Sequence, residues 1–119
     1  MGRILLAEDD HTMRMFLARA LERAGHEVFA VADGMEALEA VRAGPFDLLV
    51  ADIVMPSMDG FQLAERAEAA VPGLKVMFIT GFAAVALRGR DAVRHGAKVL
   101  SKPFHLRELV EQVDQLLKN

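Results

Sequence analysis

Short runs of apolar residues alternate along this chain with segments in which apolar residues recur at helical spacing. An uninterrupted apolar run predicts a strand that is buried on both faces, and a repeat of three and four residues predicts an amphipathic helix. Strands are predicted at residues 3–7, 27–31, 46–51, 74–79 and 98–100. Helices are predicted at residues 13–24, 35–42, 61–70 and 83–95, and from residue 105 onward. This alternation is typical of an α/β fold with a parallel sheet.

Turn and capping residues support these elements. Asp10 or Thr12 is a suitable N-cap for the first helix, and Gly25 is a suitable C-cap. Pro56 and Gly60 predict an irregular loop over residues 53–60. Five right-handed strand–helix units give a single doubly wound parallel sheet, for which we expect the strand order 2-1-3-4-5.

Polar residues stand where four of the five predicted strands end. They are Glu8 and Asp9, Asp52, Thr80, and Lys102 followed by Pro103. Because the carboxyl ends of parallel strands meet at one edge of a sheet, these side chains should converge there. The switch point of the expected topology lies between strands one and three, so Glu8, Asp9 and Asp52 should face one another.

Three neighbouring carboxylates predict a cation site. Two like charges 4 Å apart repel by about 4 kcal/mol at an effective dielectric constant of 20, so a counter-charge is needed. Mg²⁺ prefers a few carboxylates together with waters and a phosphate oxygen. We expect Asp9 and Asp52 to bind Mg²⁺ directly, Glu8 to act through a water, and the backbone carbonyl of Val54 to complete the protein ligands.

The same cluster predicts phosphoryl transfer. Asp52 is the expected nucleophile toward phosphorus, which would make it an aspartyl phosphate. The Lys102 ammonium would stabilise charge on the transferring group, and the Thr80 hydroxyl would donate to a phosphoryl oxygen. A cis peptide bond between Lys102 and Pro103 would direct the ammonium into the site.

Composition narrows the remaining possibilities. A chain of 119 residues predicts one domain, residues 1–119, without an output domain. The net charge of -3 gives no support to nucleic-acid binding. The absence of cysteine excludes disulfides and thiolate chemistry, and no apolar stretch is long enough to insert into a membrane. We expect a cytoplasmic protein.

The motifs resemble a known family. Glu8-Asp9, Asp52 within DIVMPSMDG, Thr80-Gly81 and Lys102-Pro103-Phe104 are similar to the receiver domain of two-component response regulators. The resemblance implies a CheY-like fold and Mg²⁺-dependent phosphorylation of Asp52 by a histidine kinase or histidine phosphotransferase. It also implies that the chain is not an enzyme beyond catalysing its own phosphorylation and dephosphorylation.

Longer stretches resemble stand-alone receivers of alphaproteobacteria. These stretches are ILLAEDD, DIVMPSMDG, KVMFITGFAAVAL and AKVLSKPFHLREL. The resemblance implies a cell-cycle regulator whose unphosphorylated form primes the ClpXP protease. The chain departs from most receivers at Val99, where they carry an aromatic switch residue; Phe82, together with Thr80, is the expected switch instead.

The predicted fold could serve two other functions. A phosphorelay shuttle, passing phosphoryl groups between histidine proteins, needs the same five residues and stays open. A flavodoxin-like carrier of a small cofactor is disfavoured, because no Gly-rich phosphate loop follows the first strand and the chain has no Trp or Tyr to stack on a flavin. No cofactor-binding residues other than the metal ligands are expected.

Overall fold

The sheet has the topology expected from the sequence. The computed structural model describes residues 2–81 and 97–118. In this part of the chain five strands form one sheet in the order β2-β1-β3-β4-β5, and every pairing is parallel. The strands are β1 (Arg3–Ala7), β2 (Glu27–Val31), β3 (Leu48–Asp52), β4 (Lys75–Thr80) and β5 (Lys98–Ser101).

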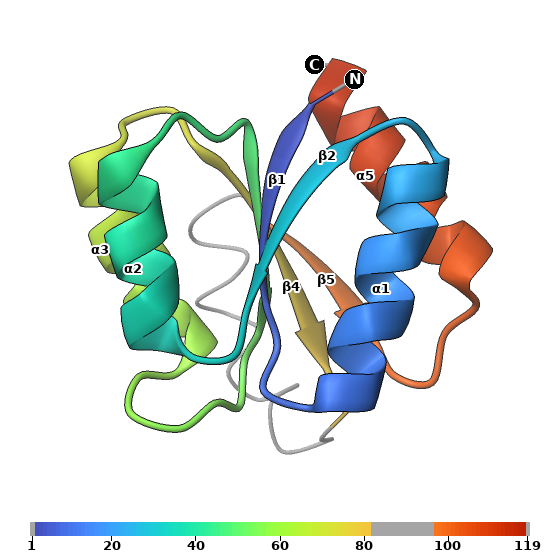
Figure 1. Ribbon diagram of the computed structural model, residues 1–119, viewed down its shortest axis with the longest axis horizontal. Helices are drawn as coiled ribbons and strands as arrows, with labels where there is room; N and C mark the ends of the chain where they lie inside the picture. Colours follow the sequence, from blue (N-terminus) through green and yellow to red (C-terminus); the bar gives the residue numbers. More distant parts are fainter. Residues whose placement is uncertain (1, 82–96, 119) are drawn as a thin grey trace.

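Helices cover both faces of the sheet. They are α1 (His11–Arg23), α2 (Gly34–Ala43), α3 (Gly60–Ala70) and α5 (Leu106–Lys118). α1 and α5 pack on one face, and α2 and α3 pack on the other (Figure 1). The helix predicted at residues 83–95 lies outside the described residues.

Each face of the sheet has its own apolar core. Leu5, Leu49 and Phe78 belong to the cluster under α2 and α3. Ile4 and Met77 belong to the cluster under α1 and α5. Successive strand residues therefore enter opposite cores, which explains why the central strands read as unbroken apolar runs.

The boundaries of three strands differ from the predictions. β3 begins at Leu48 rather than residue 46, because the Phe46 ring lies beside Phe29 and under the Arg3 guanidinium instead of joining the ladder. β4 is shifted by one residue and includes Thr80, whose carbonyl accepts a hydrogen bond from the Lys102 N–H at 2.6 Å. β3 and β5 likewise extend one residue further, to Asp52 and Ser101.

Capping side chains set the helix starts. Asp10, not Thr12, caps α1 by accepting the Met13 N–H at 2.8 Å. α3 starts at Gly60, one residue earlier than predicted, because Asp59 and Gln62 form a capping box. α2 likewise starts at Gly34, and α5 starts one residue late, at Leu106.

Candidate functional site

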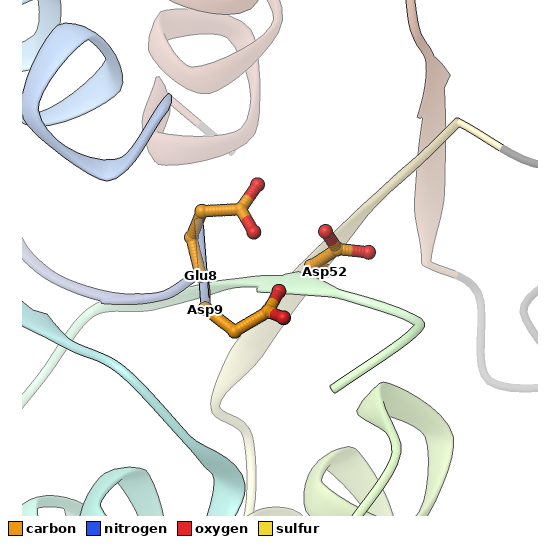
Figure 2. A group of neighbouring side chains, drawn as sticks. All are labelled: Glu8, Asp9 and Asp52. Atoms are coloured by element: carbon orange, nitrogen blue, oxygen red, sulfur yellow. The ribbon is translucent and has the colours of Figure 1, made fainter. Parts of the chain in front are cut away.

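Glu8, Asp9 and Asp52 meet at the carboxyl end of the sheet. Each offers a carboxylate oxygen, and these oxygens lie within 4.8 Å of one another. Figure 2 shows the three carboxylates directed into one space between the ends of β1 and β3. The convergence follows from the topology, because β1 and β3 are paired neighbours whose final register pair is Ala7 with Ala51.

Glu8 is the most deeply buried member of the cluster. Its side chain is fully buried, whereas Asp9 is exposed. Glu8 Oε1 accepts a hydrogen bond from Lys102 Nζ at 2.9 Å, and Oε2 accepts the Asp10 N–H at 3.3 Å. Burial raises the pKa of Glu8 to about 7; Lys102 opposes that shift and Asp52 adds to it.

Lys102 joins the last strand of the sheet to the acidic residues. Its ammonium lies 2.9 Å from Glu8 Oε1 and 3.0 Å from Asp52 Oδ2. Burial by itself lowers the pKa of Lys102, but its bonds to Glu8 and Asp52 outweigh burial, and the net shift is upward. Lys102 therefore stays charged. The Lys102–Pro103 peptide bond is cis.

The donor set fits a hard divalent cation. When all three carboxylates are ionised, they and the Lys102 ammonium carry a net charge of −2, and all three acidic groups offer oxygen atoms within 4.8 Å of one another. Lys102 pairs with Glu8 and with Asp52, and the carboxylates of all three acidic residues face the shared space. The residues present thus suit Mg²⁺.

Asp52 is held from both sides. Its Oδ1 accepts the Val54 N–H at 3.0 Å and its Oδ2 accepts Lys102 Nζ. Gly60 packs against the same backbone, and its N–H donates to the Ile53 carbonyl at 2.9 Å. A Cβ at Gly60 would lie 2.6 Å from the Asp52 carbonyl oxygen, so this close approach requires glycine.

A tight turn follows the acidic residue. Ser57 has a φ of 67°, and the Met58 N–H donates to the Pro56 carbonyl at 2.8 Å. A three-residue turn of this kind is rare and strained, and strained backbone clusters at functional sites. The loop predicted from Pro56 and Gly60 is therefore a defined structure beside Asp52.

The other predicted residues take up separate positions. Thr80 is buried at the end of β4, one strand from Asp52, and Val54 is exposed at the surface. Val99 lies on β5 opposite Phe78 and is 40% exposed. Phe82 lies outside the described residues.

The sequence reasoning missed Arg14. Its Nη1 donates to the Glu8 carbonyl oxygen at 2.9 Å, which places a guanidinium directly behind the acidic pair. The available signal was a basic residue in the first turn of a helix that follows an acidic pair, where a positive charge is unfavourable to an isolated helix.

Comparison with known proteins identifies the family. The model of the response regulator receiver domain matches residues 4–114. The chain belongs to this family. The acidic cluster and Lys102 lie within the residues that this family model matches.

One curated protein and two solved structures illustrate what the chain is similar to. It is 56% identical over 117 residues to the response regulator receiver protein CpdR of Brucella abortus, covering 98% of each chain. A solved receiver domain of the hybrid histidine kinase CckA is 37% identical, with a TM-score of 0.82, covering 98% of this chain and 99% of that one. A CheY-like receiver protein of Methanospirillum hungatei is 31% identical, with a TM-score of 0.92, covering 99% and 94%.

The fold and family predictions are confirmed by these findings. Among the described residues, no helix has the length and apolar character needed to cross a membrane. Val99 occupies the strand where, by the family resemblance, an aromatic residue is usual.

Proposed function

We propose that this receiver is a phosphorylation-controlled switch with Asp52 as the phosphoacceptor. One observation supports the proposal most directly. The buried Asp52 carboxylate lies 3.0 Å from the Lys102 ammonium and close to two further carboxylates, those of Glu8 and Asp9. This arrangement combines a nucleophile, a fixed positive charge and a cation site in one small space. The phosphodonor is a phosphohistidine of a histidine kinase or a histidine phosphotransferase.

In the chemical step, a carboxylate oxygen of Asp52 attacks phosphorus and forms a P–O bond. The P–N bond to the donor histidine breaks, and the leaving imidazole keeps the electron pair and takes a proton from solvent. Lys102 remains charged beside Asp52 and stabilises the negative charge that spreads over the phosphoryl oxygens. Water later attacks the same phosphorus, the P–O bond to Asp52 breaks, and inorganic phosphate leaves as the carboxylate is regenerated.

Mg²⁺ is the proposed cofactor. Asp9 and Asp52 would hold it directly, Glu8 would act through a water, and the Val54 carbonyl would add a backbone ligand. When bound, it neutralises the surplus negative charge of the cluster and of the incoming phosphoryl group.

The output is a change in protein binding. The Thr80 hydroxyl, one strand from Asp52, would donate to a phosphoryl oxygen and so bias the loop that follows β4. Phe82 would carry the change to a surface. We place this switch in the cytoplasm, where two-component kinases present their phosphohistidine.

The acceptor assignment is tested by a matched pair of variants. Asp52→Asn and Asp47→Asn remove one carboxylate each at opposite ends of β3. An asparagine at position 47 keeps an oxygen that accepts the Arg3 N–H, as Asp47 does at 2.7 Å. With acetyl phosphate and Mg²⁺, we expect Asp47→Asn to be phosphorylated like the wild type and Asp52→Asn not to be labelled. Equal labelling of both variants would overturn the assignment.

We propose further that the unphosphorylated form primes the ClpXP protease in the cell cycle. Support comes from the 56% identity to CpdR over nearly the whole of both chains. Purified ClpX should bind the wild type and Asp52→Asn alike, and acetyl phosphate with Mg²⁺ should release the wild type but not Asp52→Asn. Release of both, or binding of neither, would contradict this output.

A phosphorelay shuttle is the second candidate, favoured by the likeness to the receiver of a hybrid histidine kinase. It predicts that the phosphorylated protein returns its phosphoryl group to a histidine phosphotransferase. Phosphate that leaves only as inorganic phosphate would argue against the shuttle. A flavodoxin-like carrier finds no support in this acidic cluster, since its carboxylates would repel a cofactor phosphate.

A further inference from the structure

The Arg14 side chain contacts the backbone of the acidic pair, Glu8 and Asp9. Its Nη1 lies 2.9 Å from the Glu8 carbonyl oxygen and 3.4 Å from that of Asp9. Its Nη2 lies 3.0 Å from His11 Nδ1, which holds the other edge of the guanidinium. The planar guanidinium thus spans the connection between β1 and α1.

This connection is short, and three of its other backbone groups have hydrogen-bond partners. The Glu8 N–H donates to the Val31 carbonyl, and the Asp10 N–H donates to the Glu8 side chain. The Asp10 carbonyl accepts the Arg14 N–H in the first turn of α1. The Arg14 side chain contacts the carbonyls of Glu8 and Asp9. Both acidic residues therefore have a backbone contact with Arg14.

The position of Arg14 needs an explanation beyond helix stability. A positive charge near a helix N-terminus opposes the helix dipole, and the first turn of α1 has no acidic residue to offset it. Lys102 approaches Glu8 at its side chain, whereas Arg14 approaches it at its backbone. The two cations act on different parts of the same residue.

We propose that Arg14 is a positioning residue that sets the Mg²⁺ affinity of the site by holding the Glu8–Asp9 backbone, without touching the metal or the phosphoryl group. The inference rests on the proposed function, because it concerns the cation of that same site. Groups that orient metal ligands from behind usually change metal affinity by about 10- to 100-fold when they are removed.

The test compares Arg14→Met with Arg19→Met. Both variants remove one guanidinium from α1, but Arg19 is exposed, and of the two arginines only Arg14 bonds to the acidic pair within the described part of the chain. Isothermal titration with Mg²⁺ alone should show a Kd raised about 10-fold or more for Arg14→Met. Arg19→Met should stay within about twofold, as ordinary surface substitutions do. Arg14→Lys, which retains the charge and a single donor group, should fall between wild type and Arg14→Met, and it serves if Arg14→Met does not fold.

Phosphorylation by acetyl phosphate supplies the second measurement. The Mg²⁺ concentration for half-maximal rate should rise in Arg14→Met, while the rate at saturating Mg²⁺ stays near that of the wild type. An unchanged Mg²⁺ Kd in Arg14→Met would overturn this inference and leave the proposed function intact. A wild-type protein that binds no Mg²⁺ would overturn the metal site and the inference together.

Discussion

Glu8 shows how one residue can be costly to the fold and useful to the site. It is fully buried beside another carboxylate, and Lys102 is the cation that contacts its side chain. A buried hydrogen-bonded pair of this kind is weak evidence for stability, because desolvation offsets much of the attraction. The burial of Glu8 is better explained by its place in the cluster of carboxylates that would bind a cation.

The raised pKa of Glu8 predicts a pH-dependent stability. Between about pH 4.5 and about 7, the unfolded chain releases the Glu8 proton while the folded protein keeps it. The contribution of Glu8 to the free energy of unfolding is therefore fully present below pH 4.5 and is lost as the pH rises through about 7. Each unit of pKa difference is worth about 1.4 kcal/mol.

Urea unfolding without Mg²⁺ at pH 5 and pH 8 measures this loss. The isosteric variant Glu8→Gln should lose less stability over this range than the wild type, and Glu27→Gln, at an exposed position on β2, should behave like the wild type. Mg²⁺ should restore part of the lost stability of the wild type at pH 8. Identical pH profiles for wild type and Glu8→Gln would rule out the buried carboxyl as the cause.

At the scale of elements, the contact between α3 and the end of β3 depends on Gly60. An added Cβ would meet the backbone of Asp52 and Ile53, which cannot rotate away as a side chain does. We expect Gly60→Ala to lower the free energy of unfolding by about 1–3 kcal/mol, the usual range for overpacking. Gly44→Ala is the matched control, because a Cβ there would meet no atom within 4 Å.

Chemical denaturation of the two glycine variants checks this contact. Gly60→Ala should also slow phosphorylation of Asp52, since the helix would be displaced from the phosphoacceptor strand. A Gly60→Ala protein as stable as Gly44→Ala would show that the close approach is not needed.

Element types could be predicted more reliably than their ends. The apolar pattern located all five strands, and it was clearest for β1, β3 and β4, because a strand buried on both faces has no polar positions that interrupt the pattern. It placed Phe46 in β3, although that ring packs beside Phe29. It missed the early start of α3, which depends on the reciprocal bonds of Asp59 and Gln62. Hydrophobicity does not report such side-chain partners.

At the scale of the whole molecule, the strand order brings residues that are far apart in the sequence together in one site. Glu8 and Asp52 meet because β1 and β3 are neighbours, and Lys102 reaches them from β5 across the carboxyl edge. The sequence predicted this convergence because parallel strands end at one edge. It could not predict the contact of Arg14 with the acidic pair, since a guanidinium that binds backbone carbonyls does not require particular residue types at the positions it contacts. It could not predict the burial of Glu8 relative to Asp9 either.

The central claim is that Asp52 accepts the phosphoryl group, and chemical trapping tests it in the unaltered protein. The wild type is treated with acetyl phosphate and Mg²⁺, then reduced with borohydride, which converts an aspartyl phosphate to homoserine, and digested for peptide mapping by mass spectrometry. The account predicts homoserine at position 52 and unmodified aspartate at positions 9, 10 and 59. Homoserine at one of those positions with Asp52 intact would contradict it.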